Sequence, residues 1–328
     1  MYGVQAQAAT FTVTNGNDSG AGSLRAAVDS VHAHANVNHT INVASPFANG
    51  SDSIVLATAT NSQSFLVIRA GKNVTLNGNS VAISGSGNNR RLFAVENGAT
   101  LNVERVHFRN VKAPAIPGGG ILNQGTLSVK SCIFSNIDIG NTGNAFGGVL
   151  VHGNPSVAFT VSGCTFVNNK AQYGGAIAMQ GGCGTAVKVV GNLFYNNTVA
   201  GSSPGGAAVW MNTGNLATIN PLCSYNVWDK QDNLGTGDWR PSGAGNKLKT
   251  TGLDAWISGY MPTIVGATAA NMGILPSGLS GFPTTDFYGN PRTFPYGVVG
   301  AIARTVAFDV HLLRHRNSLL NAKHRRQH

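Results

Sequence analysis

Charged residues are scarce in this chain. They make up 10% of its 328 residues, against about a quarter in an average soluble domain. Between residues 99 and 228 the only acidic residues are Glu104 and Asp138. A glycosidase needs two carboxylates about 5 to 9.5 Å apart, and a calcium-dependent lyase needs a cluster of oxygen ligands. The middle of the chain therefore provides neither arrangement.

Other signatures are missing as well. There is no run of about 18 apolar residues, so no membrane-spanning helix is expected. The four cysteines form no Cys-x-x-Cys pair, and His32, His34, His39 and His152 lack the spacing of metal ligands. No Ser-His-Asp order, phosphate loop or dinucleotide fingerprint stands out. We expect neither a metal nor a cofactor.

The net charge of +10 would suit a nucleic-acid partner if it were concentrated on one surface. Half of it lies in the last 25 residues, from Arg304 onward, where six basic residues accompany Asp309. The other half is spread over the rest of the chain. We therefore expect no nucleic-acid binding, and a disordered basic tail over residues 304–328.

One pattern is repeated four times between Leu101 and Asn197. Each copy reads apolar-x-Val-x4-Phe-x-Asn, and a glycine pair with small apolar residues follows each copy. The spacing is constant within a copy and varies between copies, which is typical of a stacked repeat whose insertions are loops. The repeated positions are Phe108, Phe134, Phe166 and Phe194, and two residues later Asn110, Asn136, Asn168 and Asn196.

The alternating apolar residues of each copy predict a short strand with one buried face. A single copy has nothing to bury that face against, so the copies must stack, with parallel strands about 4.8 Å apart. The predicted fold is all-β, a single-stranded parallel β-helix. It should be right-handed, because parallel crossovers are overwhelmingly right-handed. Like residues from successive coils then form columns.

The repeated asparagines are expected to form a structural ladder rather than a catalytic site. Asn tolerates left-handed backbone at turns, and stacked amides hydrogen-bond along a column. Cys132 and Cys164 share one offset, two residues before a repeat Phe, so they should stack too. Their Cβ atoms would point the same way, which strains a disulfide. We favour buried free thiols, with a disulfide as the alternative, and leave the redox state of Cys183 and Cys223 open.

Residues 11–39 predict an N-terminal cap. Phe11-Thr12-Val13-Thr14 alternates as a strand, and Ser23 suits the N-cap of an amphipathic helix that buries Leu24 and Val28. Such a helix covers the core that a solenoid exposes at its end. The predicted divisions are a signal-peptide remnant or disordered start (1–10), the cap (11–39), β-helix coils (40–228), loop-rich C-terminal coils and cap (229–303) and the tail (304–328).

The cap resembles a known family. Gly22-Ser23-Leu24-Arg25-Ala26-Ala27, after a strand and a turn rich in Asn, Asp, Ser and Gly, is similar to the N-terminal cap of bacterial secreted parallel β-helix proteins named for a CSLREA motif. Gly22 stands where that motif has Cys, and Ala26 stands where it has Glu. The resemblance implies a secreted protein with a pectin-lyase-like solenoid. Ala6-Gln7-Ala8 has the form of a signal-peptidase site, although an Ala-rich start explains it equally well.

Two further segments resemble β-helix families. Phe166-Val167-Asn168-Asn169 and Gly174-Gly175-Ala176-Ile177 are close to the FxxN and GGAI signatures of chlamydial-type polymorphic outer-membrane proteins. The run from Thr285 to Arg292, followed by Gly300-Ala301, resembles the terminal signature of β-helix proteins with interchangeable C-terminal anchors. Ile302 follows where that family commonly has an acidic residue. These resemblances imply an extracellular or bacterial outer-membrane location and an adhesin-like or passenger-like role.

Arg105, His107 and Lys130, with Arg109, are expected to lie near one another on the first two copies. A metal-free polysaccharide lyase would use such groups to neutralise a carboxylate and remove a proton, whereas a solvated basic patch explains them without chemistry. Glu104 and Lys130 occupy one offset in adjacent copies and should form an exposed ion pair worth at most about 1 kcal/mol. We prefer the patch and assign no catalytic residue; Arg105, His107 and Lys130 are the lyase candidates.

Aromatic residues near the repeats are candidate binding residues, because aromatic side chains stack on sugars or anchor protein partners. An alternative for each is simple packing against the neighbouring coil. The hypothesis is a secreted or cell-surface β-helix that binds a polysaccharide or a surface protein without catalysis. A polysaccharide lyase or glycoside hydrolase on the same scaffold is the alternative, and the oligomeric state is undetermined. The candidates are Tyr173, Tyr195, Trp210, Tyr225 and Trp228.

Overall fold

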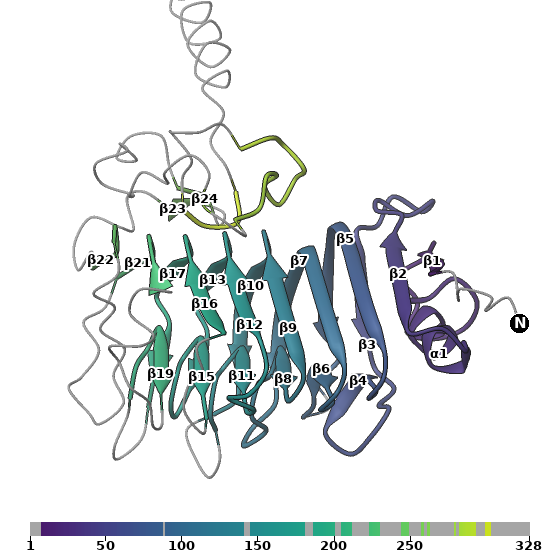
Figure 1. Ribbon diagram of the computed structural model, residues 1–328, viewed down its shortest axis with the longest axis horizontal. Coiled ribbons are helices and arrows are strands. Elements are labelled where there is room, and N and C mark those ends of the chain that lie inside the picture. The colour runs from purple at the N-terminus through teal and green to yellow at the C-terminus, as the bar shows by residue number, and fades with distance from the viewer. Residues whose placement is uncertain are drawn as a thin grey trace, which may run out of the picture.

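The protein forms a parallel β-helix of about seven turns in the computed structural model (Figure 1). The predicted fold class is therefore confirmed. The structure describes residues 8–87, 89–140, 145–180, 186–200, 205–211, 223–229, 244–248, 257–258, 261–262, 279, 282–292 and 299–302. The predicted tail at 304–328 and Cys183 lie outside these residues, as does most of the predicted start at 1–10.

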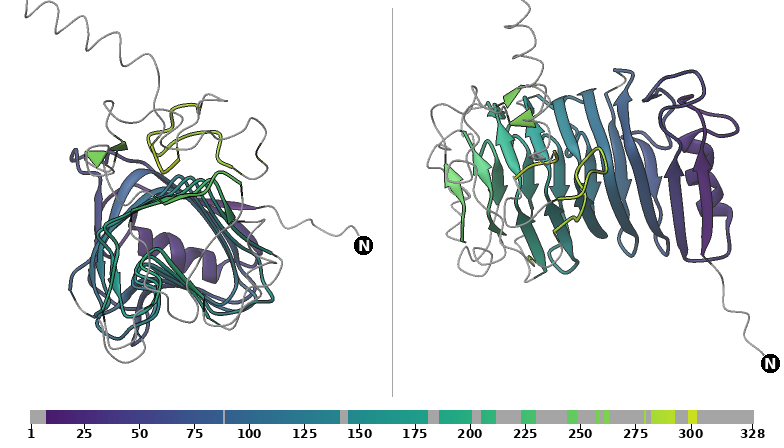
Figure 2. Two further views of the ribbon diagram at one scale, coloured as in Figure 1. Left: turned by 90° about the vertical axis from the view of Figure 1, so that its left-hand side faces the viewer. Right: turned by 90° about the horizontal axis from the view of Figure 1, so that it is seen from above.

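Each coil contributes strands to three faces, which Figure 2 shows along the axis. The first face holds β1 (Ala9–Val13), β2 (Asn38–Val43), β9 (Thr126–Lys130), β12 (Phe159–Ser162), β16 (Val187–Val190) and β20 (Cys223–Ser224). The second holds β3 (Ser53–Leu56), β10 (Ile133–Asp138), β13 (Thr165–Val167), β17 (Leu193–Tyr195), β21 (Val227–Trp228) and β22 (Lys247–Leu248). The third holds β4 (Ser64–Ile68), β6 (Arg91–Val95), β8 (Ile121–Asn123), β11 (Leu150–His152), β15 (Ile177–Met179) and β19 (Val209–Met211).

Two long strands join the first and second faces. β5 (Asn73–Gly85) and β7 (Thr100–Lys112) run through the corner, so both faces belong to one hydrogen-bonded sheet, while the third face is a separate sheet. β14 (Lys170–Ala171) and β18 (Thr198–Val199) extend the second face beyond its asparagine turn, and β23 (Ile257–Ser258) pairs with β24 (Met261–Pro262).

Left-handed backbone marks two corners of the coil. The corner between the first and second faces has φ between +48° and +64° at Arg105, Ser131, Gly163, Gly191 and Tyr225. The corner after the second face has φ between +50° and +57° at the repeat asparagines Asn110, Asn136, Asn168 and Asn196. Asn adopts this conformation more readily than most residues. This preference explains why an asparagine lies two residues after the phenylalanine in every copy of the repeat. The amides of Asn136 and Asn110 lie 3.4 Å apart and those of Asn196 and Asn168 lie 2.7 Å apart, so parts of the predicted ladder are hydrogen-bonded.

The repeat phenylalanines form the predicted column inside the solenoid. The rings of Phe108, Phe134, Phe166 and Phe194 stack in order, with centroids 4.9 to 5.0 Å apart and interplanar angles of 8° to 12°. All four are fully buried. Trp228 pairs in register with Phe194 and continues the same position into the next coil.

A second set of asparagines is buried in the wall of the solenoid, and the sequence analysis missed it. The set consists of Asn169, Asn192, Asn197 and Asn226. Each amide bridges to main-chain groups of the preceding coil. For Asn192, the oxygen accepts from the Cys164 N–H at 2.9 Å, and the nitrogen donates to the Val161 carbonyl at 3.0 Å. These bonds satisfy main-chain groups where the strands end.

Cys132 and Cys164 lie two residues before the column phenylalanines and are buried free thiols, as predicted. Cys223 is also buried. Burial raises the pKa of Cys132 well above its ordinary value, which keeps this thiol protonated at neutral pH.

Helix α1 (Leu24–Ala33) lies across the N-terminal end of the coils (Figure 2). The hydroxyl of Ser23 accepts from the Ala26 N–H at 3.1 Å, which confirms the predicted N-cap. The helix buries Leu24, Ala27, Val28 and Val31 against the first coils.

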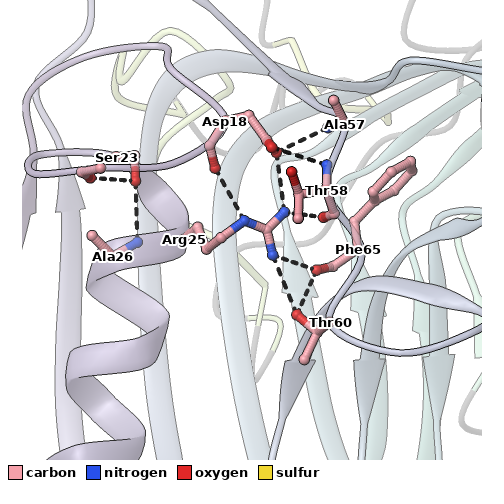
Figure 3. Close-up of polar contacts among 9 residues, drawn as sticks. Asp18, Ser23, Arg25, Ala26, Ala57, Thr58, Thr60 and Phe65 are labelled. Atoms are coloured by element: carbon pink, nitrogen blue, oxygen red, sulfur yellow. Dashed lines mark hydrogen bonds and ion pairs between the residues drawn. The ribbon is translucent and has the colours of Figure 1, made fainter.

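Arg25 ties this helix to the first coil (Figure 3). Its guanidinium donates to the carbonyls of Asp18, Thr58 and Phe65, and it forms an ion pair of 3.0 Å with the Asp18 carboxylate. That carboxylate also accepts from the main-chain N–H groups of Ala57 and Thr58, both at 2.9 Å. Arg25 belongs to the Gly22–Ala27 motif by which the cap was recognised in the sequence. The motif therefore contains a residue that anchors the cap to the first coil.

Residues 282–292 and 299–302 form a strap along the flank of the solenoid (Figures 1 and 2). These residues were expected within the loop-rich C-terminal coils and cap. They contact coils between Ser80 and Leu193 from outside, across the second face. The strap covers outward apolar residues of that face, including Ile133 and Leu193. Burial of this apolar strip stabilises the docked position.

Candidate functional site

A pocket of about 560 Å³ lies where the strap meets the second face. Five structural units line it: the loop between β2 and β3, strand β5, strand β7, the start of β10, and the strap. The lining residues are Ser45, Pro46, Gly50, Asp52, Asn79, Ser80, Ala82, Arg105, His107, Arg109, Ile133, Phe287 and Tyr288. The pocket thus brings together residues that are more than 200 positions apart in the chain.

Strand alternation places Arg105, His107 and Arg109 on the outside of β7, while Phe108 points into the core. In the sheet, His107 pairs with Ala82 on one side and with Ile133 on the other. Ala82, His107 and Ile133 all line the pocket, so it lies over this point of the face.

His107 lines the pocket and is 8% exposed. Its Nε2 lies 2.8 Å from the hydroxyl of Ser135, and its ring meets the ring of Phe287 edge-on, with centroids 6.4 Å apart. Burial, and after it the charge of Arg109, lower the pKa of His107 to about 4. The imidazole is therefore neutral at pH 7.

The two arginines have different surroundings. Arg105 donates from Nε to the Phe287 carbonyl at 3.1 Å and from Nη2 to Oδ1 of Asn79 at 3.0 Å. Its guanidinium lies against Gly289, where an added Cβ would approach Nη2 to 2.9 Å. Arg105 therefore holds the strap. Arg109 has a weaker contact, with Nη2 3.4 Å from the hydroxyl of Ser53.

Lys130 does not line the pocket, although the sequence analysis placed it beside Arg105 and His107. It lies on the first face and forms the predicted ion pair with Glu104, at 3.9 Å. The physical reason is the corner at Arg105 and Ser131, which directs residues on its two sides to different faces. The structure thus brings together two of the three lyase candidates.

The five aromatic candidates lie elsewhere. Tyr173 and Trp210 pack with Phe146, with ring centroids 5.0 to 5.3 Å apart, and Trp210 is 5% exposed. Tyr195 and Tyr225 pack against the apolar cluster that includes Leu193, and Trp228 packs against the main core. Packing accounts for all five, and a binding role for them stays a prediction.

The sequence analysis did not select Tyr288 as a binding residue. This side chain lines the pocket and is 54% exposed, and its ring is held edge-on by Phe287 at 5.1 Å. Tyr288 belongs to the run from Thr285 to Arg292, whose resemblance to a C-terminal signature of β-helix proteins was recognised in the sequence. Nothing in the sequence indicated that this segment lies beside β7.

The chemistry that the pocket can perform follows from its lining. It contains two guanidiniums, a neutral imidazole, one carboxylate (Asp52), hydroxyl and amide groups, and an exposed aromatic ring. The pocket lining has one carboxylate, so it lacks the pair of carboxylates that a glycoside hydrolase uses. Arginine pairs suit carboxylate or other oxyanion groups of a ligand.

Within the part of the chain that the structure describes, no group of three His, Cys, Asp or Glu residues could hold a metal ion. No helix among the described residues is long and apolar enough to cross a membrane. Comparison of the chain with protein-family models, curated protein sequences and solved structures gives no match, so the functional argument depends on the geometry of this pocket.

Proposed function

We propose that this protein is a secreted or cell-surface β-helix that binds an acidic saccharide in the flank pocket without turning it over. The observation that carries the proposal is the grouping of Arg105, His107 and Arg109 in one pocket with a single carboxylate, Asp52. The resemblance of the cap and repeats to secreted bacterial β-helix proteins supports the location. The proposal narrows the expected partner from any polysaccharide or surface protein to a carboxylate-bearing sugar.

The lining suits such a ligand. A volume of about 560 Å³ falls within the roughly 300 to 1,000 Å³ of ordinary ligand pockets. A guanidinium binds a carboxylate through two parallel hydrogen bonds, and Arg109 has the looser contacts of the two arginines. Asn79 and Ser80 offer groups for sugar hydroxyls, and the exposed ring of Tyr288 offers a stacking platform at the mouth.

A polysaccharide lyase is the second candidate. The neutral imidazole of His107 beside Arg109 is an arrangement that could accept a proton from the carbon next to a uronate carboxylate. Two observations favour binding alone: Nε2 is engaged by Ser135, and the ring is covered by Phe287. Substrate turnover separates the two candidates.

The test uses an array of acidic and neutral oligosaccharides together with an absorbance assay for unsaturated products. We expect binding of uronate-containing sugars, no unsaturated product, and a loss of about tenfold or more in affinity for Arg109→Met, because a charged hydrogen-bonding partner is removed. Lys130→Met removes a cation from the other face and should bind like the wild type. Equal binding of neutral sugars, or unchanged affinity in Arg109→Met, would refute the proposal. Turnover that His107→Ala abolishes would establish the lyase instead.

A further inference from the structure

The strap supplies one wall of the pocket. The carbonyl oxygen of Phe287 accepts from the hydroxyl of Ser80 at 2.7 Å and from Nε of Arg105 at 3.1 Å. The Phe287 ring contacts the His107 ring edge-on, and Phe287 and Tyr288 both line the pocket. Without the docked strap, the solenoid would present these groups on an open face.

One side chain links the two segments of the strap, residues 282–292 and 299–302. Arg292 is 6% exposed and donates from Nη2 to the carbonyls of Gly300 at 2.8 Å and Ala301 at 3.1 Å. Its Nε donates to the Thr285 carbonyl at 3.2 Å, and its guanidinium lies over the ring of Phe282 at 5.1 Å. Arg292 does not line the pocket. It therefore acts on the pocket through the strap.

The strap is attached to the solenoid by a few polar contacts. The Ser131 hydroxyl donates to the Thr285 carbonyl at 2.6 Å, and the Gly300 N–H donates to the Gly191 carbonyl at 2.8 Å. The Ala301 N–H donates to the Thr165 hydroxyl, also at 2.8 Å.

Apolar contacts complete the attachment. Phe287, Ala301 and Ile302 cover Ile133 on β10. Phe282 and Val299 cover Leu193 on β17. Both apolar clusters are separate from the main core of the solenoid, so release of the strap would leave the interior packing of the coils in place.

We propose that ligand binding and strap docking are coupled, with Arg292 as the positioning residue that controls the affinity of the pocket. This inference rests on the proposed function. A ligand that contacts Arg109 on the solenoid and Tyr288 on the strap binds the docked state more tightly than the undocked state. It must therefore shift the equilibrium toward docking, and any change that releases the strap must weaken binding.

The experiment measures binding of trigalacturonate by calorimetry and amide hydrogen exchange of the full chain. In the wild type the probe should slow exchange of the Phe287 and Gly300 amides, which donate to the Ala301 and Gly191 carbonyls. Arg292→Met should speed exchange at both amides and raise the Kd about tenfold or more, while the amide of Phe134 in the core keeps its protection. Arg292→Lys, which keeps the charge but loses the planar fork, should fall between the two.

Thr165→Val provides an independent variant, because it removes the acceptor for the Ala301 N–H and leaves the pocket lining intact. It should weaken binding in the same direction even if Arg292→Met fails to fold. Unchanged Kd in a variant whose strap exchanges faster would overturn the coupling while leaving the binding site intact. Binding without slower strap exchange would do the same. No binding by the wild type would refute the proposed function, and the coupling with it.

Discussion

Replacing Asp18 by Asn is expected to loosen the N-terminal cap in a pH-dependent way. Burial alone would raise the pKa of the Asp18 carboxyl, but hydrogen bonds from Thr58, Ala57 and Arg25 outweigh it and lower the pKa from 3.8 to about 2. The ionised form is thus held more tightly in the folded cap than in the unfolded chain. The Asn side chain keeps the shape of Asp but loses the charge that these donors share.

The magnitude follows from the lowered pKa. A change from 3.8 to about 2, at about 1.4 kcal/mol per unit, corresponds to about 2 kcal/mol of stabilisation at neutral pH. The Asp18 side chain is 19% exposed, so solvent screening reduces this figure, and we expect about 1 to 2 kcal/mol. Because the folded pKa is depressed, this contribution is complete above about pH 4. It is lost as the pH falls from about 4 toward 2.

The assay is local, because the cap of a repeat protein can open without unfolding the remaining coils. Hydrogen exchange of the α1 amides reports the free energy of cap opening at pH 6 and at pH 2. Asp18→Asn should exchange faster than the wild type at pH 6. The difference should be much smaller at pH 2, where about half of the folded wild-type carboxyl is protonated and most of its contribution is lost. Asp29→Asn, on the exposed side of the same helix, is the matched control and should show no such difference.

One outcome would refute this reasoning. If Asp18→Asn lost the same free energy at pH 2 as at pH 6, the cap would depend on the shape of the side chain and not on its charge.

Three further experiments test the interior. Phe134→Ala should lower the free energy of unfolding by about 3 to 5 kcal/mol, because the ring is fully buried between two stacked rings; a loss below about 1 kcal/mol in urea unfolding would contradict the column. Asn192→Leu should cost at least about 2 kcal/mol, because it leaves the Cys164 N–H and the Val161 carbonyl without their partner. The thiols of Cys132 and Cys164 should be unreactive toward Ellman's reagent at pH 8 until the protein unfolds, and rapid labelling of the native protein would show that this wall of the solenoid opens.

Local and repeated features were predictable from the sequence. The constant offset of Phe134 and its counterparts predicted the ring column, because parallel in-register strands stack equal positions. The same rule predicted the Glu104–Lys130 ion pair and the neighbouring free thiols. Ser23 was identified as the N-cap because an N-cap needs only residues within one turn of helix.

The buried asparagines were harder to predict. Asn169 and Asn197 follow repeat asparagines, but the first two copies have Val111 and Ile137 at that offset. A position occupied by both apolar and amide side chains shows no repeat signal. Only the structure shows that Asn169 uses its amide to bond main-chain groups of the preceding coil.

The sequence by itself determined the architecture, because stacking of like residues is a property of neighbouring repeats and needs no distant partner. The tertiary structure alone decided the pocket, which depends on where a loop near Asp52, the corner at Arg105 and a strap that contains Tyr288 meet on one flank. Ser131, a corner residue with left-handed backbone, turns the chain between Lys130 and the pocket. Lys130 therefore lies on a different face, although it is close in sequence to Ile133, which lines the pocket. Docking of the strap depends on apolar residues that point outward, such as Ile133, whose partners on the strap lie more than 150 positions away in the chain.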